Sequence, residues 1–192
     1  MPPYTKFNLV QNAPEWLAWR ETGLGASSAP TIMGENPWQT RDNFMKQLLH
    51  PVACEPCEAM EVGHALEPVA RRQYVRKTGY AVEPVCLQST RWPWLLASLD
   101  GMTADGLHAV EIKCGTAAYN ATAEAMRVPL HYRGQVQQQM AVSGLQTIDF
   151  WAWWPGLQPI GLRVRRNDAY IARLVEATKS FWDELCAERA GA

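Results

Sequence analysis

The chain has 192 residues, of which 47% are hydrophobic and 19% are charged, and its formal net charge is −1. This composition excludes a disordered chain, and a single domain of this length buries roughly 70% of the surface that its unfolded chain exposes. No segment approaches the roughly 20 apolar residues of a membrane-spanning helix and the N-terminus lacks a secretory pattern, so we expect a cytoplasmic protein without a membrane partner.

Helices and strands alternate along the predicted chain. Ser27 or Ser28 and Asn167 or Asp168 are good N-cap residues, and Gly144 is typical of the position after a helix. The predicted helices cover residues 14–20, 27 or 28 to a break at 34–38, 40–49, 59–77, 129–142 and 168–188, and the predicted strands cover 80–88, 94–100, 107–114, 147–154 and 160–164. We find no repeat and no linker, so we predict one α/β domain with a mixed sheet flanked by helices.

The stretch from residue 95 to residue 114 carries the most informative pattern. An apolar run ends at Asp100, and a second apolar run carries Glu111 and Lys113 two positions apart. Asp105-Gly106 lies between the runs and is typical of a tight turn, so we predict that the runs pair as antiparallel strands. Because side chains alternate between the two faces of a strand, Glu111 and Lys113 share one face and their apolar neighbours point into the core.

The predicted hairpin brings the carboxylates of Asp100 and Glu111 together with the ammonium of Lys113. Two adjacent carboxylates repel each other unless a cation lies between them, and hard oxygen ligands suit Mg²⁺ or Mn²⁺. A lysine beside the metal can orient an attacking water or neutralise charge on a phosphate. The pattern therefore favours phosphodiester hydrolysis; the alternative is an ion pair on a solvated strand face.

Two further sets of polar side chains fall on helix faces. Glu67 shares a stripe with the small residues Gly63 and Ala70, where an inward carboxylate would need a cation. Gln135 and Gln139 lie one turn apart, and their amides could hold a water or a sugar-phosphate oxygen. The alternatives are a surface position for Glu67 and an outward polar face for the glutamines.

Arg20 precedes the segment Gly25-Ala26-Ser27-Ser28, at a predicted helix start. Free N–H groups, hydroxyls and a guanidinium together make a pocket for a terminal phosphate. Basic residues also cluster at 71–77 and at 163–166, where they either contact nucleic acid or form ordinary solvated faces.

Seven short motifs occur in order between residue 16 and about residue 144. They are Trp16-x-x-x-Arg20, Gly25-Ala26-Ser27, Gly34-x-Asn36-Pro37-Trp38, Gly63-x-x-Leu66-Glu67-Pro68, Ser98-Leu99-Asp100-Gly101, Glu111-Ile112-Lys113-Cys114 and Gln135-Val136-Gln137. Together they resemble the YqaJ-type viral recombinase nucleases, the family of the phage lambda exonuclease. One departure is Leu99, which stands where the name of the fold, PD-(D/E)XK, has a proline. That proline shapes the backbone and takes no part in the chemistry.

The resemblance implies a restriction-endonuclease-like PD-(D/E)XK core in a single nuclease domain over residues 1–192. It implies a Mg²⁺-dependent 5′-to-3′ exonuclease that acts on linear double-stranded DNA with a free 5′ end. Such an enzyme releases 5′-mononucleotides and leaves 3′ overhangs for recombination by strand annealing. The resemblance also implies a homotrimeric ring, a single-strand annealing protein as a partner, and a phage or prophage origin in a bacterial host cell.

The resemblance further implies which residues hold the metal. Asp100, Glu111 and the carbonyl of Ile112 would bind one Mg²⁺, for which Mn²⁺ could substitute, and Glu67 would help to hold a second ion. We expect two-metal, in-line hydrolysis with the two ions about 4 Å apart. One ion would lower the pKa of a water and the other would stabilise the leaving 3′ oxygen.

The remaining implied roles concern the attacking water and the DNA end. Lys113 would position the water with Gln135 beside it, and Arg20, Ser27 and Ser98 would bind the 5′-phosphate. These assignments complete the predicted catalytic site.

Three other functions compete with this prediction. A site-specific endonuclease of the same fold would share the hairpin but would not need a terminal-phosphate pocket. A non-catalytic DNA-binding module would have lost one of the hairpin's three charged residues. An iron–sulfur nuclease would need four well-placed cysteines. The chain instead has the pair Cys54-x-x-Cys57, which could be half a metal site, and the isolated Cys86, Cys114 and Cys186, so we expect free thiols.

Overall fold

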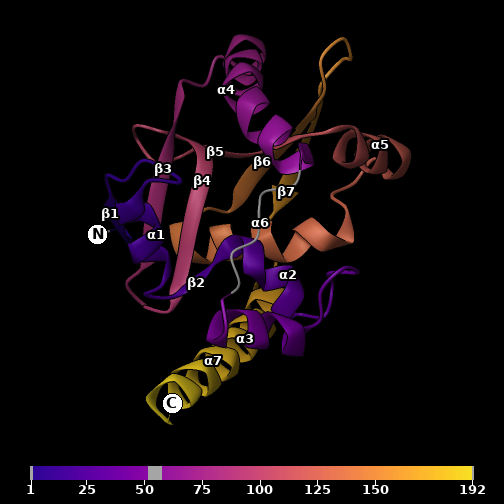
Figure 1. The fold of residues 1–192 in the computed structure, drawn as a ribbon. Helices are drawn as coiled ribbons and strands as arrows, with labels where there is room; N and C mark the ends of the chain where they lie inside the picture. The colour runs from indigo at the N-terminus through magenta and orange to yellow at the C-terminus, as the bar shows by residue number, and fades with distance from the viewer. Residues whose placement is uncertain (1, 52–57, 192) are drawn as a thin grey trace.

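The computed structural model describes residues 2–51 and 58–191, and a mixed sheet lies at its centre (Figure 1). Its strands are β1 (Tyr4–Phe7), β2 (Leu24–Gly25), β3 (Val82–Ser89), β4 (Leu95–Thr103), β5 (Ala109–Cys114), β6 (Thr147–Trp153) and β7 (Ile160–Arg165). Within the described residues these seven strands run in the order β1-β3-β4-β5-β6-β7, with β2 beside β4. The β2–β4 and β5–β6 pairs are parallel, and the other pairs are antiparallel.

Helices cover both faces of this sheet. They are α1 (Pro14–Arg20), a 3₁₀ turn η1 (Ala26–Ser28), α2 (Ala29–Ile32), α3 (Arg41–Leu49), α4 (Glu58–Thr78), α5 (Thr116–Ala125), α6 (Leu130–Ser143) and α7 (Asp168–Gly191). In the part of the chain that the structure describes, no helix combines the length and the apolar character needed to cross a membrane. The predicted α/β class with a mixed sheet flanked by helices is confirmed.

Local sequence signals account for most element boundaries. Gly106 has a φ of 72° in the β4–β5 turn, where its N–H donates to the carbonyl of Thr103 at 2.9 Å. Gly144 ends α6 with a φ of 77°, a backbone conformation that glycine adopts without steric cost. The carbonyl oxygen of the Asn167 side chain accepts from the N–H of Tyr170 at 2.9 Å and caps α7. The predicted hairpin and the predicted cap are therefore both present.

The two faces of the sheet have separate cores. On one face, Val136 and Met140 of α6 pack with Leu87 and Phe150, all four of them fully buried. On the other face, α4 packs its Ala70 and Tyr74 against Val110, Ile112 and Trp151. A central strand buried on both sides explains why β5 contains so few residues that face solvent.

A β-bulge in β4 sets the direction of Asp100. Glu83 of β3 pairs with Met102 and Val85 pairs with Leu99, so the single residue Pro84 lies opposite two residues of β4, Asp100 and Gly101. Proline has no N–H to give to the ladder, and a bulge turns its side chains away from the regular alternation. Asp100 therefore lies where β4 and β5 separate, because the pairing of these strands involves Gly101 with Val110 and Met102 with Ala109.

Four elements differ from the sequence predictions. β1, β2 and α5 were not predicted. α5 follows Gly115, which offers no side-chain cap, and depends on the packing of Ala118 and Thr122. The predicted helix at Ser27 is a 3₁₀ turn followed by the single turn α2. Of the tryptophans, Trp16, Trp19, Trp151 and Trp153 are buried, whereas Trp38 is 76% exposed.

Candidate active site

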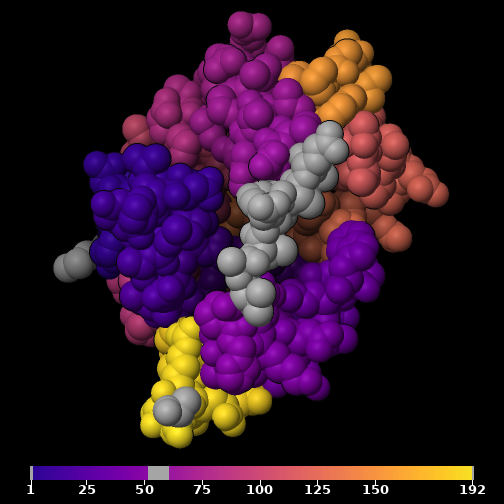
Figure 2. Space-filling view, viewed as in Figure 1, coloured from indigo at the N-terminus to yellow at the C-terminus, as the bar shows by residue number. Residues whose placement is uncertain are grey.

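One cavity of about 460 Å³ lies between the N-terminal segment and α4, and Figure 2 shows the hollow between these segments (indigo and magenta). All nine residues to which the sequence assigned a metal-binding, catalytic or phosphate-binding role line this cavity: Arg20, Ser27, Glu67, Ser98, Asp100, Glu111, Ile112, Lys113 and Gln135. Its volume falls in the usual range of roughly 300–1,000 Å³ for small-ligand sites. The predicted convergence of these residues is therefore present, whereas their chemical roles stay predictions.

Glu111 is the most deeply buried charge in the cavity, with an exposed fraction of 1%. Its Oε1 accepts from Nε2 of Gln135 at 2.5 Å and lies 2.6 Å from Nζ of Lys113, and its Oε2 accepts from Nε2 of Gln139. A buried carboxylate is costly unless donors surround it, and here three donors fix both oxygens. The two glutamines therefore face inward, and the alternative of an outward polar helix face is wrong.

Asp100 is held by the neighbouring strand and by α4. Its Oδ2 accepts from the N–H of Ile112 at 2.6 Å, and its backbone carbonyl accepts from Nε of Arg71 at 2.6 Å. Burial raises the pKa of Asp100 well above its ordinary value, and repulsion from Glu111 and Glu67 raises it further. The side chain thus occupies a position where a negative charge is unfavourable without a nearby cation.

Glu67 extends from α4 into the same cavity, so the alternative interpretation that Glu67 is a surface residue is wrong. It forms an ion pair with Arg71 one helical turn later. Burial raises the pKa of Glu67, and attraction to Arg71 offsets part of this shift. The sequence placed Arg71 in a basic cluster and missed its contact with the site. The spacing of four residues from Glu67 was the available signal.

Lys113 carries a stable positive charge. Burial disfavours its charged form, but attraction to Glu111 and Asp100 outweighs burial, so the pKa of Lys113 is raised. Its ammonium also lies 4.9 Å from the centre of the Tyr132 ring. At neutral pH this side chain can donate hydrogen bonds to a water or a phosphate, and it cannot serve as a base.

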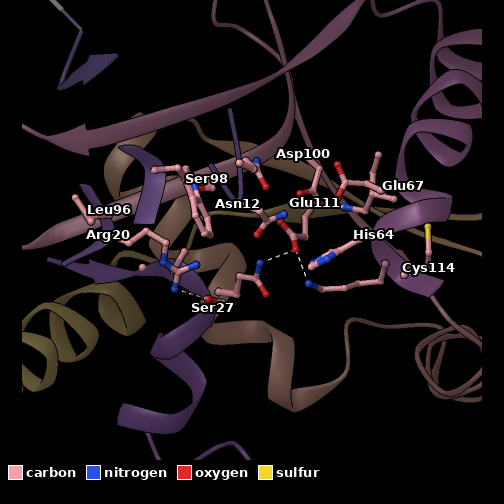
Figure 3. Close-up of a pocket in the computed structure, with 18 of the residues that line it drawn as sticks. Asn12, Arg20, Ser27, His64, Glu67, Leu96, Ser98, Asp100, Glu111 and Cys114 are labelled. Carbon is pink, nitrogen blue, oxygen red and sulfur yellow. Dashed lines mark hydrogen bonds and ion pairs between the residues drawn. The ribbon is translucent and has the colours of Figure 1, made fainter. Parts of the chain in front are cut away.

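A second group of polar side chains lines the opposite part of the cavity, as Figure 3 shows. The guanidinium of Arg20 lies 4.8 Å from the Trp16 ring centre and reaches Oγ of Ser27 at 3.5 Å. Trp16 donates from Nε1 to Oγ of Ser98 at 3.1 Å. Gly25 permits this arrangement, because a Cβ there would lie 2.8 Å from the Arg20 guanidinium.

The oxygen donors fit a hard divalent cation. Glu67, Asp100 and Glu111 bring three carboxylates to one cavity, which Lys113 and Arg20 also line, and Arg71 pairs with Glu67 from outside the lining. Carboxylate oxygens are the ligands that Mg²⁺ or Mn²⁺ prefers. Within residues 2–51 and 58–191, no three Asp, Glu, His or Cys side chains already form a ligand group. The carboxylates accept hydrogen bonds and form ion pairs with other groups of the protein.

Several lining residues had no recognisable signal in the sequence. Gln11 and Asn12 line the cavity but belong to no motif that was assigned to it, and His64 occupies an unspecified position of the motif Gly63-x-x-Leu66-Glu67-Pro68. Cys86, Cys114 and Cys186 are free thiols, as predicted. The Cys54-x-x-Cys57 pair lies outside the described residues.

Replacing Asp100 by asparagine is expected to stabilise the protein in the presence of a chelator. Because the folded-state pKa of Asp100 is raised, its contribution to stability falls as pH rises from the unfolded pKa towards the folded one. Asparagine removes the charge and can still accept from the N–H of Ile112. A gain of about 1 kcal/mol would raise Tm by roughly 2–4 °C for a domain of about this size. Thermal melts at pH 7 measure this shift, and a lower Tm would contradict the electrostatic explanation.

The fold and the cavity together define an α/β domain with a cluster of carboxylates and a lysine at the place where β4 and β5 separate. Residues 15–146 match the YqaJ-like viral recombinase domain, and the chain belongs to this family. It is 28% identical over 184 residues to the uncharacterized protein YqaJ of Bacillus subtilis (strain 168), which covers 92% of this chain. The chain spans 57% of the length of that relative.

Crystal structures support the same conclusion. The alkaline exonuclease LHK-Exo of Laribacter hongkongensis is 32% identical, with a TM-score of 0.81 over 92% of this chain and 94% of that chain. Its complex with dAMP matches equally well, at 31% identity. A phage-related exonuclease of Haemophilus somnus 129PT, at 15% identity over 87% of this chain and 96% of its own, shares the fold with a TM-score of 0.66. The predicted restriction-endonuclease-like fold is therefore confirmed.

Proposed function

We propose that this protein is a Mg²⁺-dependent exonuclease that degrades one strand of linear double-stranded DNA in the 5′-to-3′ direction. It would release 5′-mononucleotides and leave 3′ single-stranded overhangs for recombination by strand annealing. The observation that carries the proposal is one cavity lined by Asp100, Glu111 and Lys113 at one part and by Arg20 and Ser27 at another. A cluster suited to phosphodiester hydrolysis thus lies beside a group suited to a terminal phosphate.

The metal would be held by Asp100, Glu111 and the carbonyl of Ile112, with Glu67 contributing to a second ion. When bound, divalent cations supply Lewis-acid stabilisation of the negative charge that develops on the phosphate and the leaving oxygen. Mn²⁺ is expected to replace Mg²⁺ because both favour oxygen ligands in similar geometry. Chelation should therefore remove activity without unfolding the protein.

The protein's own side chains orient the remaining participants. The charged ammonium of Lys113 would hold the attacking water or a phosphate oxygen by hydrogen bonding. Gln135 would lie beside that water while also fixing Glu111, to which it already donates at 2.5 Å. Arg20, with Ser27 and Ser98, would bind the 5′-phosphate through a charge-assisted contact.

The relatives support this choice of reaction. LHK-Exo is described as an alkaline exonuclease, and its complex with dAMP contains a 5′-mononucleotide, the class of product that we propose here. The resemblance to viral recombinases supports a role in DNA recombination. We place the activity in a single nuclease domain over residues 1–192, in the cytoplasm of a bacterial host, with a phage or prophage origin.

Digestion of end-labelled DNA tests the proposal. Linear duplex labelled at the 5′ end should release labelled mononucleotide immediately, whereas 3′-labelled duplex should keep its label until late in the reaction. Closed circular duplex should resist, and a chelator should stop digestion. Rapid nicking of circles would favour the alternative of a site-specific endonuclease, and binding without cleavage would favour a non-catalytic DNA-binding module.

The protein is also expected to form a homotrimer and to act with a single-strand annealing protein. A net charge of −1 gives little general attraction to DNA, so processive digestion would depend on a closed ring around the duplex. Light scattering should return about three times the chain mass of 21.6 kDa. A monomer at micromolar concentration that still digests long duplex processively would contradict the ring.

A further inference from the structure

Trp38 presents an exposed aromatic ring on a rigid loop. Its side chain is 76% exposed, although tryptophan is among the most hydrophobic side chains. The loop is held from both sides, because the side-chain oxygen of Asn36 accepts from the N–H of Trp38 at 3.0 Å and its amide donates to Thr31 at 2.9 Å. Thr31 is itself buried. These hydrogen bonds hold the backbone that carries the exposed ring.

Neighbouring contacts hold the same loop against α6 and α7. Glu35 forms an ion pair with Arg133 and accepts from the hydroxyl of Tyr170 at 2.8 Å. The N–H of Glu35 donates to the carbonyl of Pro30 at 2.7 Å. These contacts fix the position of the α2–α3 segment beside the start of α6 (Figure 1), so the backbone of Trp38 is already placed before any ligand binds.

The ring of Trp38 is the outer end of an aromatic row. It contacts His131 edge-on at 4.8 Å between ring centres, and His131 contacts Tyr132 at 4.2 Å. The ammonium of Lys113 lies 4.9 Å from the Tyr132 ring centre. The row Trp38–His131–Tyr132 therefore leads from the surface to the lysine of the candidate active site.

We infer that Trp38 stacks on an unpaired base of the DNA substrate, next to the strand end that enters the active site. This inference rests on the proposed function. Every base has a flat π-face, so stacking on an aromatic side chain tolerates any sequence, as an exonuclease requires. Inside a duplex the neighbouring base pairs cover both faces of each base. A base at the open end of the DNA has a free face, and the aromatic row leads from Trp38 to the active site. Both points favour a base at that end as the partner of Trp38.

Binding of normal and abasic DNA by matched variants tests the inference. Anisotropy of labelled duplex reports binding, with Ca²⁺ in place of Mg²⁺ to suppress cleavage, since nine tryptophans make intrinsic fluorescence unspecific. Two further duplexes are used. In one, the two end nucleotides of one strand are abasic, and in the other duplex, the two end nucleotides of the complementary strand are abasic. Trp38→Ala removes the ring, Trp38→Phe keeps a smaller aromatic face, and Leu107→Ala removes another exposed apolar side chain, 66% exposed, in the β4–β5 turn.

Trp38→Ala is expected to weaken binding of the normal duplex by about 5- to 150-fold, the usual range for losing one base–aromatic stack. The wild-type protein should lose a similar factor when the stacked strand carries the abasic end. Trp38→Ala should bind that abasic duplex and the normal duplex equally. Trp38→Phe should keep most of the affinity, and Leu107→Ala should match the wild type.

Two outcomes would overturn the inference. Trp38→Ala could bind normal and abasic ends with wild-type affinities, or it could weaken binding to all ends by one common factor. A common factor accompanied by a changed mass in light scattering would assign Trp38 to a contact between copies of the chain. If the wild type cuts duplex while either result holds, the inference fails alone. If the wild type neither binds nor cuts DNA, the proposed function fails with it.

Discussion

Replacement of Asp100 by alanine is expected to reduce DNA hydrolysis at least a thousandfold, equivalent to about 4 kcal/mol of transition-state stabilisation. The reason is that Asp100 and Glu111 together form the oxygen-rich face of the cavity, and neither carboxylate alone offsets the charge of a bound divalent cation. Lys113→Ala should cause a loss of similar order, since no other described ammonium lies within 4 Å of Glu111. Initial rates on 5′-labelled linear duplex with saturating Mg²⁺ measure both effects.

A matched control separates this effect from a general loss of charge. Glu124 lies exposed on α5 and forms no ion pair with any residue that the structure describes. Glu124→Ala should therefore cut DNA at the wild-type rate. Circular dichroism and thermal melts establish that Asp100→Ala and Lys113→Ala remain folded. Digestion by folded Asp100→Ala at a near wild-type rate would show that the site is assigned wrongly.

The parts of the fold with strong local signals could be predicted from the sequence. Asp105-Gly106 defined the β4–β5 hairpin, and the positive φ values of Gly106 and Gly144 correspond to the predicted turn and helix end. β1 could not be predicted in this way, because it pairs with β3, which is distant in sequence. α5 likewise depends on packing against the sheet, since its first residue follows a glycine without a capping side chain.

The candidate site could likewise be predicted from the sequence only where local signals determine it. Strand alternation was enough to place Glu111 and Lys113 on one face, and the structure places both towards α6. The exact direction of Asp100 could not be predicted, because it depends on a bulge opposite Pro84 in another strand. The burial of Glu111 depends on glutamines from α6, whose inward orientation only the packed structure determines.

Arg20→Ala is expected to abolish most of the enzyme's preference for a 5′-phosphorylated end. The wild type should degrade duplex with a 5′-phosphate about 10- to 100-fold faster than duplex with a 5′-hydroxyl, since a charge-assisted contact contributes about 1.5–3 kcal/mol. Burial lowers the pKa of Arg20, but from an ordinary value so high that the guanidinium remains charged. Arg20→Lys should keep part of the preference, because an ammonium retains the charge without the planar pair of donors.

Arg91 offers a matched control for this prediction. Its guanidinium lies 4.6 Å from the Trp92 ring centre, much as Arg20 lies beside Trp16, but Arg91 does not line the cavity. Arg91→Ala should therefore keep the full phosphate preference. Parallel time courses on the two ends, with each variant, measure the ratio directly. Equal wild-type rates on phosphorylated and hydroxyl ends would contradict a terminal-phosphate pocket, and the direction of digestion would then require another explanation than Arg20 and Ser27.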